Sequence, residues 1–267
     1  MSEFILLGNT TKSQMFGCVI KTDKHTIVID GGTMGDEKQL ADLLAQSADS
    51  HVDAWFFTHP HHDHIGCFVN LLKNYPDIKI DKVYHHFPDY ETVRPHIRTE
   101  TEGALVADFF KICRDRQTIA LSRGDVFDFD GVTLRVLRVY NPAITENFIN
   151  NTSTVYRIEG ENASFLILGD LGIEGGCELM KNCPKELLQA DYTQMAHHGQ
   201  SGVSREFYEY IRPQKCIWPA PDWLWDNDAG NGFDTGPWHT VRTREWMQAL
   251  GITEHIVEKD GMQKIVF

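Results

Sequence analysis

The chain has 267 residues, of which 42% are apolar and 11% aromatic, so it can bury a large core and is neither disordered nor fibrous. Its 25 basic and 38 acidic residues give a net charge of −13, which argues against a protein that coats nucleic acid through a broad basic surface, although a local pocket can still bind phosphate. The six cysteines are scattered, the sequence lacks a basic and apolar leader, and no apolar run reaches about 18 residues. These features predict a soluble cytoplasmic protein with reduced thiols and no membrane partner. We expect a single domain over 1–267.

Strand patterns dominate the first part of the chain. Short runs of β-branched and apolar residues, separated by turns of Gly, Asn and Asp-Lys, predict a β-meander. A leucine face at helical spacing follows, and then a strand rich in Trp and Phe. The expected strands lie at 3–9, 15–23, 25–32, 52–59 and 79–87, and the expected helices at 36–48, 67–76 and 100–117.

The second part begins with more strands and then changes to alternating strands and helices. The expected strands lie at 125–131, 133–140, 153–160, 164–170, 191–199 and 215–220, the helices at 177–189, 204–211 and 243–251, and a hairpin at 255–267. Residues 219–239 are rich in Pro, Gly and Trp without periodicity, which predicts a long loop of the kind that often carries function. Strand blocks and β-α units in both halves predict two packed sheets with helices outside.

A crowded polar motif follows the predicted strand 52–59. It reads His59-x-His61-x-Asp63-His64, and its imidazole nitrogens and carboxylate oxygens suit zinc, iron or manganese. The first two histidines are two residues apart, so in extended backbone they project to one side. The alternative is an exposed histidine-rich loop, but the buried strand before the motif and the helix start after it favour a metal site.

This motif resembles that of the metallo-β-lactamase-fold hydrolases, whose shared sequence is His-x-His-x-Asp-His. The resemblance extends over nearly the whole chain and implies an α/β (α+β) fold, the four-layer αββα sandwich, with the metals at one edge between the sheets. It implies that Asp30 orients the ligand loop from the end of an early strand. It also implies that Asp170 bridges two metals, where the alternative is an ordinary strand-end or cap aspartate.

Two later segments resemble the C-terminal domain of ComEC-type competence (DNA-uptake) proteins and the phosphorylcholine esterases. In "QMAHHGQSG", His197 and His198 match a His-His-Gly that supplies late site residues. The sequence Pro-Trp-His-Thr, with His239, stands where that subgroup has Tyr-Gly-His-Pro. The resemblance implies His198 as a metal ligand and His197 and His239 as catalytic residues, although which of the two adjacent histidines is the ligand stays open.

The chain departs from its superfamily before Asp170. Most members have a histidine about twenty residues before that aspartate, whereas this chain has Asn150 and Asn151 there. We expect Asn151 to take the position of that histidine. Its side chain is a neutral amide, which shifts the metal preference of the site from zinc toward manganese. The alternative is that His85, His86 or His239 supplies the missing ligand, and His86 could also line the cleft.

The resemblance implies a hydrolase that uses a metal-activated hydroxide. One or two divalent ions, zinc or manganese, would lower the pKa of bound water from about 15.7 to about 7. Asp63 would orient the nucleophile, and His197 or His239 would donate a proton or bind an anion. The expected substrate is a small phosphoester or phosphodiester, with no extended nucleic acid. The alternatives are a thioester, lactone or lactam hydrolase, or a non-catalytic metal-binding regulatory module.

Overall fold

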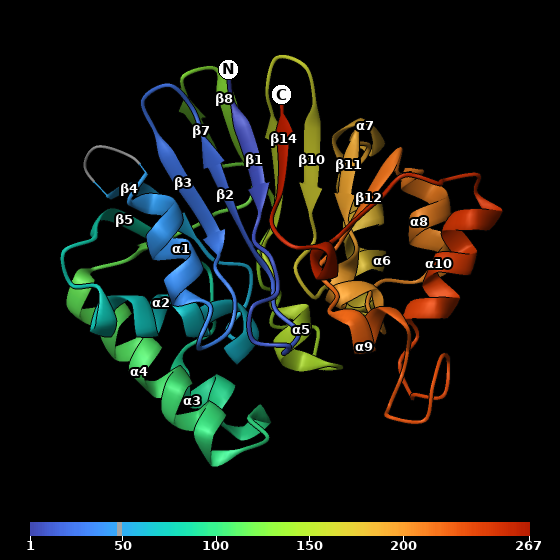
Figure 1. Ribbon diagram of the computed structural model, residues 1–267, viewed down its shortest axis with the longest axis horizontal. Coiled ribbons are helices and arrows are strands. Elements are labelled where there is room, and N and C mark those ends of the chain that lie inside the picture. Colours follow the sequence, from blue (N-terminus) through green and yellow to red (C-terminus); the bar gives the residue numbers. More distant parts are fainter. Residues whose placement is uncertain (47–49) are drawn as a thin grey trace.

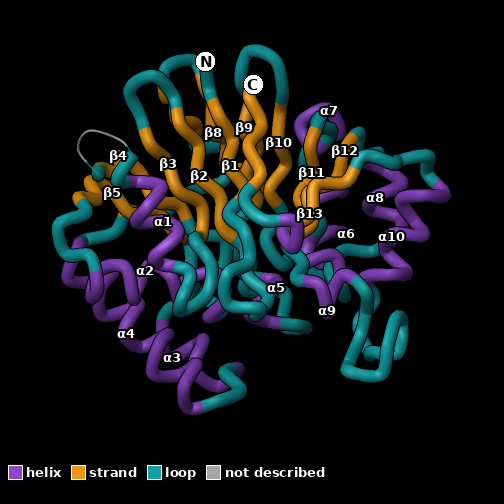
Figure 2. Tube along the Cα trace, in the orientation of Figure 1, coloured by secondary structure: helices purple, strands orange, loops and turns teal. Residues whose placement is uncertain are grey.

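Two seven-stranded sheets pack face to face, with helices on both outer sides (Figure 1, Figure 2). The computed structural model describes residues 1–46 and 50–267, so residues 47 and 48 of the helix expected at 36–48 lie outside the described part. Helix, sheet, sheet and helix follow one another across the molecule. This order confirms the predicted four-layer αββα sandwich.

The first sheet combines the predicted meander with a parallel block. Its strands are β1 (Glu3–Leu6), β2 (Gly17–Lys21), β3 (Thr26–Asp30), β4 (His51–Phe56), β5 (Lys79–His85), β6 (Ile119–Ala120) and β14 (Gln263–Val266). Their spatial order is β14-β1-β2-β3-β4-β5-β6. Pairing is antiparallel from β14 to β3 and parallel from β3 to β6. The antiparallel run β1-β2-β3 confirms the meander.

The second sheet mirrors this plan. Its strands are β7 (Val126–Phe129), β8 (Val132–Arg138), β9 (Val155–Glu159), β10 (Ser164–Ile167), β11 (Tyr192–Gln194), β12 (Lys215–Trp218) and β13 (His255–Val257). Their order is β13-β12-β11-β10-β9-β8-β7, antiparallel from β7 to β10 and parallel from β10 to β13.

The hairpin expected at 255–267 is wrong. Strand β13 lies at the edge of the second sheet, whereas β14 pairs with β1 at the edge of the first, with Glu3 opposite Val266. A short 3-10 turn, η3 (Glu258–Asp260), and Gly261 at φ 89° carry the chain from one sheet to the other. The last strand therefore links the two sheets instead of folding back on its predecessor.

The two longest helices, α2 and α4, lie in the first half of the chain. They are α1 (Glu37–Leu44), α2 (His62–Asn74), α3 (Tyr90–Val93), α4 (Glu100–Arg116), α5 (Phe148–Asn151), α6 (Ile173–Asn182), α7 (Lys185–Leu188), α8 (Arg205–Ile211), α9 (Asp222–Trp225) and α10 (Thr240–Ala249), with 3-10 turns η1 (Arg94–His96) and η2 (Ala196–Gly199). The helix expected at 177–189 is split between α6 and α7 because Pro184 has no N–H to donate. Within 1–46 and 50–267, no helix is both long enough and apolar enough to cross a membrane.

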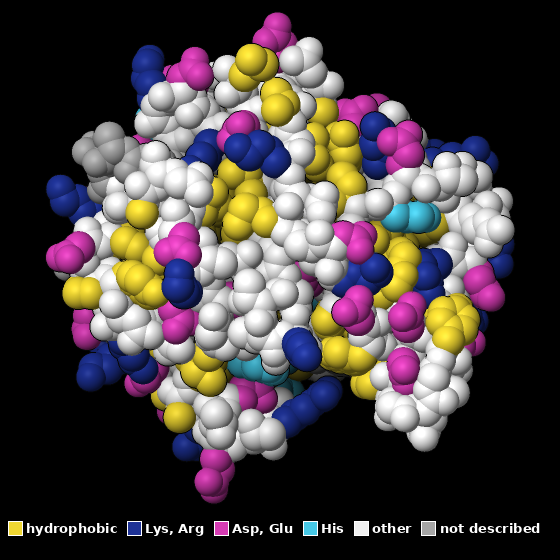
Figure 3. Space-filling view, viewed as in Figure 1, with side chains coloured by type: hydrophobic (Ala, Val, Ile, Leu, Met, Phe, Trp, Pro, Cys, Tyr) yellow, Lys and Arg dark blue, Asp and Glu magenta, His cyan; other side chains and the backbone are white. Residues whose placement is uncertain are grey.

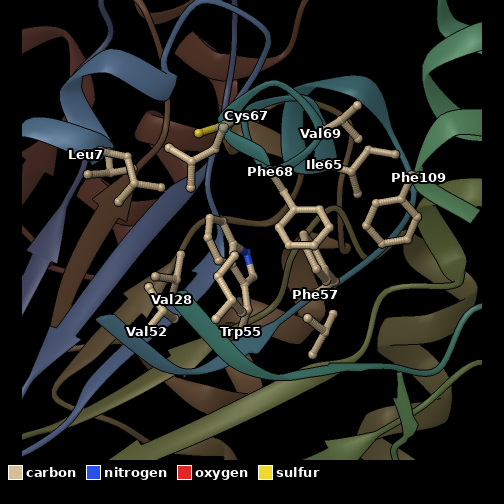
Figure 4. Packing of buried hydrophobic residues seen from close by; sticks show 14 of the residues in the cluster. Leu7, Val28, Val52, Trp55, Phe57, Ile65, Cys67, Phe68, Val69 and Phe109 are labelled. Atoms are coloured by element: carbon tan, nitrogen blue, oxygen red, sulfur yellow. The ribbon is translucent and has the colours of Figure 1, made fainter. Parts of the chain in front are cut away.

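Three apolar layers hold these elements together. Between the sheets, Phe4 stacks on Phe165 with ring centroids 4.3 Å apart. Outside the first sheet, Trp55 packs edge-on against Phe68 of α2 at 4.9 Å, within the aromatic cluster in Figure 4. A third layer lies between the second sheet and α6, α8 and α10. The packing of Trp55 and Phe68 fixes the start of α2, and with it the histidine motif.

Candidate metal centre

Polar side chains from both sheets meet where the strands end. Asp30 is the last residue of β3, and His59 follows β4. Asp170 follows β10, and His198 follows β11. These strand ends lie at the lower centre of Figure 1, near α5, so the two sheets bring together residues far apart in sequence.

The histidine motif spans a strand end and a helix start. His61 is the residue before α2 and has extended backbone, with ψ at 152°. Asp63 and His64 then lie in the first turn of that helix and are buried. The loop and the helix turn therefore present their side chains toward Asp170 from two directions.

Asp30 holds this loop from behind. Its fully buried carboxylate accepts hydrogen bonds from the Thr58 amide (2.7 Å) and the Thr58 hydroxyl (2.6 Å). Its Oδ2 also lies 2.7 Å from Nδ1 of His64. Burial raises the pKa of Asp30, and the bonds from His64 and Thr58 oppose that rise. The carboxylate thereby turns Nε2 of His64 away from itself and toward Asp170.

Two clusters of donor atoms share Asp170. The first, called here the inner group, is Asp63, His64, Asp170 and His198; the second, the outer group, is His59, His61 and Asp170. Within each group the donor atoms lie within 4.8 Å of one another.

The distances within the inner group are short. Nε2 of His64 lies 3.2 Å from Oδ1 of Asp170. Nε2 of His198 lies 3.4 Å from Oδ2 of Asp170 and 3.2 Å from Oδ2 of Asp63. Four donor atoms thus face one small volume.

The outer group is looser. Nε2 of His59 lies 3.6 Å from Oδ2 of Asp170 and 3.0 Å from Nδ1 of His61. Burial and the nearby His64 keep the pKa of His59 well below its usual range, and burial lowers that of His61 to about 4. Both imidazoles are therefore neutral near pH 7 and can offer a lone pair.

The buried atoms at the centre of the inner group have no hydrogen-bond partner. They are Nε2 of His64, Nε2 of His198 and both carboxylate oxygens of Asp170. Nδ1 of His198 donates to the Pro219 carbonyl (2.8 Å), and Nδ1 of His64 faces Asp30. Histidines that bind metals through Nε2 usually donate from Nδ1 to such an acceptor. Buried polar atoms are rarely unsatisfied, so this donor set fits a divalent metal ion.

Charge at the centre also favours a cation. Burial opposes the charged form of His64, but Asp170 and Asp30 outweigh it and raise the pKa to about 10. Asp170 and Asp63 likewise raise the pKa of His198 well above its usual range against the effect of burial. Without metal, protons carry the positive charge that these carboxylates stabilise. A metal ion would replace those protons.

The His-His-Gly turn sends two adjacent histidines in different directions. His197, His198 and Gly199 have φ values of 53°, 57° and 81°, in the left-handed region. A side chain on Gly199 would place Cβ 2.4 Å from the Trp218 ring, so only glycine fits there. The structure places His198 in the inner group, whereas Nε2 of His197 lies 3.8 Å from Oδ2 of Asp170.

Asn151 is bound to α6 and joins neither group. Its Oδ1 accepts hydrogen bonds from the amides of Gly172 (3.0 Å) and Gly175 (3.1 Å) at the start of α6. Its Nδ2 donates to the Glu146 carbonyl and to Glu174. The side-chain oxygen thus caps α6, and the side-chain nitrogen is bound to Glu146 and Glu174.

Asn150 has the opposite surroundings. Its Oδ1 is buried without a hydrogen-bond partner, and its Nδ2 donates to Asn147 and lies 3.5 Å from Nε2 of His197. The side chain lines the cavity above the metal groups. Of the two asparagines, Asn150 is the one that faces the site.

A cavity of about 680 Å³ opens over the two groups. Most of the residues that line it carry a polar group: Gln14, His61, His62, Asp63, Arg98, Thr99, Thr101, Glu102, Asn147, Asn150, His197, Gln200 and Ser201, with Met34, Leu105 and Trp238 as apolar members. His239 is exposed at the rim, with Nδ1 3.3 Å from the Ser201 hydroxyl. Figure 3 shows histidine side chains in the lower half of this face, beside acidic and basic ones.

His85 and His86 lie away from the centre. Nε2 of His85 bonds to Thr118, and Nδ1 of His86 bonds to the Leu121 carbonyl. Neither histidine lines the cavity or belongs to a metal group. In this structure they do not supply the ligand that the superfamily pattern lacks.

Sequence reasoning missed a pair of glutamines that connects the two halves of the site. Nε2 of Gln200 donates to Oε1 of Gln14 (3.1 Å), and Nε2 of Gln14 donates to Oδ2 of Asp63 (2.8 Å). Single glutamines in loops carry no spacing signal, so only the folded chain reveals them. The pair ties the His-His-Gly turn to the first turn of α2.

A sequence profile described as the metallo-beta-lactamase superfamily matches residues 18–216. ComE operon protein 3 of Bacillus subtilis (strain 168) is 29% identical over 184 residues, which cover 68% of this chain and 21% of that protein. Hydroxyacylglutathione hydrolase of Aeromonas salmonicida (strain A449) is 26% identical over 170 residues, 63% of this chain and 51% of that one. This chain thus matches about a fifth of the length of ComE operon protein 3 and about half of the length of the hydroxyacylglutathione hydrolase.

A solved structure shares the fold over its full length. The metallo-beta-lactamase fold protein YhfI from Bacillus subtilis superposes with a TM-score of 0.58 over 100% of both chains, at 12% sequence identity. The profile match confirms the predicted family, and the match to ComE operon protein 3 confirms the resemblance to ComEC-type proteins. This chain belongs to the metallo-beta-lactamase superfamily, a superfamily of metal-dependent hydrolases.

Proposed function

We propose that this chain hydrolyses a small phosphoester or phosphodiester with divalent metal ions held by the inner and outer groups. The observation that carries the proposal is the Asp170 carboxylate, which is buried, lacks a hydrogen bond and is shared by both groups beneath a polar cavity. A bridging carboxylate is the arrangement that holds two ions close together. The substrate would bind in the cavity above it.

The proposed metals are zinc or manganese. When bound, such ions polarise the ester and lower the pKa of a coordinated water to near neutrality. The inner group offers two imidazoles and two carboxylates, a set that suits zinc. The outer group offers two imidazoles and the shared carboxylate, and a harder oxygen ligand from Asn150 would favour manganese there.

His197 is the proposed proton carrier. Its Nδ1 donates to the Ser201 carbonyl (3.2 Å), so the lone pair is on Nε2, which faces Asp170. Burial lowers the pKa of His197, so the ring is neutral near pH 7. A neutral imidazole can take a proton at Nε2 and then donate it to the departing oxygen.

Asp63 and His239 have supporting roles in the proposal. Asp63 is ionised, because His198, whose Nε2 lies 3.2 Å from Oδ2 of Asp63, holds the pKa of Asp63 well below the usual range despite burial. With Oδ2 held by Gln14, it is positioned to orient the attacking water. His239, exposed at the rim beside Ser201, is placed to contact an anionic part of the substrate.

The cavity supports a small anionic substrate. Arg98 lines it, and a guanidinium group matches the geometry of phosphate oxygens. Trp238 adds an apolar wall on another side. The net charge of −13 disfavours an extended nucleic acid, which needs many phosphate contacts along a basic surface.

A thioester is the second candidate substrate. The observation that favours it is the match to a hydroxyacylglutathione hydrolase over 63% of this chain. The same metal chemistry serves both ester classes, so the cavity decides between them. Arg98 lines the cavity and can pair with a phosphate group, which favours the phosphoester over the thioester.

The test compares turnover of a phosphodiester, a phosphomonoester, a thioester, a lactone and nitrocefin by protein loaded with zinc or with manganese. We expect a phosphoester to react at least about tenfold faster than the others, a difference of about 1.4 kcal/mol in activation free energy. Arg98→Gln should raise KM for the phosphoester while leaving metal content unchanged. A faster thioester would favour the second candidate, and bound metal without turnover would favour a regulatory module.

The proposal includes one domain over 1–267 in a reducing, cytoplasmic compartment. The contact of Phe4 with Phe165 joins the two halves of the chain in one core, which supports a single domain. The six cysteines are free thiols, and five of them are buried. Reduced thiols are typical of a cytoplasmic protein.

A further inference from the structure

A second cluster of metal-ligating side chains lies at the other end of the first sheet. His51 and Asp53 are the first and third residues of β4, and Asp81 is the third residue of β5. His25 is the residue before β3, which pairs with β4. These four residues are called here the sheet-end cluster. Strand β4 runs from this cluster toward His59, so about 20 Å of extended chain separates it from the metal centre.

The donor atoms of the sheet-end cluster already approach one another. Nε2 of His51 lies 2.9 Å from Oδ1 of Asp81, and Nδ1 of His25 lies 2.9 Å from Oδ1 of Asp53. One donor atom from each of His51, Asp53 and Asp81 falls within 4.8 Å of the others. One nitrogen and two oxygens thus converge from the starts of β4 and β5, and His25 at the start of β3 reaches them through its contact with Asp53.

The two aspartates stand side by side. Val52 pairs with Ile80 and Ala54 with Lys82, which places Asp53 next to Asp81 across the parallel strands. Like charges in such positions repel each other and destabilise the pairing. Burial disfavours the charge of Asp53, but the His25 hydrogen bond and the Thr26 amide lower its pKa, so it is ionised near pH 7. A bound cation would replace this repulsion with attraction.

An ion can reach the cluster from solvent. The four side chains are between 21% and 57% exposed. A hollow of about 420 Å³ lies beside them, lined by His25, Asp53 and Asp81 together with Phe127 and Phe129. The aromatic wall limits the water around the ligands on that side.

We propose that the sheet-end cluster is a zinc site with His51, Asp53 and Asp81 as ligands and with His25 holding Asp53 in place. One imidazole and two carboxylates give three protein ligands, and a water would complete the tetrahedral set that zinc takes. In the bound state Nε2 of His51 carries no proton and the ring proton is on Nδ1, so Nε2 of His51 and Oδ1 of Asp81 both bind the ion. The ion would join the starts of β4 and β5, with β3 attached through His25, and it is independent of the hydrolytic centre.

The experiment measures zinc per chain after equilibrium dialysis at one free zinc concentration. Wild type is compared with Asp81→Asn, which removes one charge and keeps the side-chain shape. The matched control is Asp77→Asn, at an exposed aspartate four residues earlier and outside the cluster. We expect Asp81→Asn to hold one zinc fewer per chain than wild type and the control. Because this is a difference, it does not depend on how many ions the hydrolytic centre retains.

A second variant and a stability measurement complete the test. His51→Gln should show the same loss of one zinc, and added zinc should raise Tm less in both variants than in wild type. A similar Tm for all proteins without zinc would show that the variants fold. Equal zinc content in wild type, Asp81→Asn and His51→Gln would overturn the proposal.

Discussion

The inner and outer groups share Asp170 but are supported differently by the rest of the chain. In the inner group, Asp30 and the Pro219 carbonyl fix the histidine rings through Nδ1, and Gln14 holds Asp63. In the outer group, the two histidines contact each other at 3.0 Å, and the ring of His61 is only partly buried. Ligands held in advance bind a metal with less loss of conformational freedom. We therefore expect the inner group to bind its ion more tightly.

Replacing the shared ligand should have the largest effect. Asp170→Asn removes the charge that both groups use, so both ions should be lost and hydrolysis should fall to the buffer background. His61→Ala should remove only the outer ion, with hydrolysis also lost if both ions are needed. Metal analysis alongside turnover measures both effects. Retention of the inner ion in Asp170→Asn would contradict a shared carboxylate.

The two asparagines give a matched pair of histidine variants for the outer group. Asn150→His places an imidazole on the cavity side, so it should slow loss of the outer ion to a mild chelator and shift preference toward zinc. Asn151→His breaks the cap of α6, so it should lower the free energy of unfolding by roughly 2 to 4 kcal/mol. Calorimetric metal titration and urea unfolding test the pair. Two equal, tight sites in wild type, unchanged in Asn150→His, would argue against an asymmetric centre.

The metal motif could be predicted from sequence because its signals are local. His59, His61, Asp63 and His64 fall within six positions between a strand pattern and a helix pattern. Asp170 follows one apolar strand and the His-His-Gly follows another, so the order of strands predicts that both lie at the same edge of the sheet. The layered fold follows from the same pattern of strands and helices.

What the sequence did not predict depends on contacts between distant segments. Asn150 and Asn151 share one short helical turn, and only the position of α6 decides which of them caps that helix. Gln14 reaches Asp63 across 49 residues. The pairing of β14 with β1 likewise joins the two ends of the chain, where local turn signals favoured a hairpin. Propensity and spacing carry no information about such contacts.

Weakening the support of the inner group should have a smaller effect than removing a ligand. Asp30→Asn loses the charge that fixes His64, so the affinity of the inner ion should fall about 10- to 100-fold. The outer ion should change less, because Asp30 reaches His59 only through the Thr58 hydroxyl. Calorimetric titration of metal-free protein separates the two ions. An equal loss at both groups would contradict the separate support of the inner one.

The last prediction concerns stability and pH and not metal affinity. It concerns Glu258, a buried carboxylic acid whose charge would interact with His198 and Asp63 of the inner group. Its Oε1 accepts a hydrogen bond from Asn9, and its Oε2 has no partner. Burial raises the pKa of Glu258 well above its usual 4.5, so the folded protein keeps this proton longer than the unfolded chain does.

The sign of the pH dependence of Glu258 follows from that retained proton. Between the unfolded and folded pKa values the folded state binds more protons, so the free energy of unfolding falls as pH rises, by up to about 1.4 kcal/mol per pH unit. Glu258→Gln removes this contribution to the pH dependence of the free energy of unfolding. In protein stripped of metal, wild type should lose stability relative to Glu258→Gln as pH increases from about 5 to about 8, measured by urea unfolding. An ion in the inner group would lower the pKa of Glu258 by its charge, so restoring metal should flatten the dependence. A stability difference that stays constant with pH in the metal-free protein would show that Glu258 is ionised in the folded state, and that the surroundings of the inner group are more polar than its burial indicates.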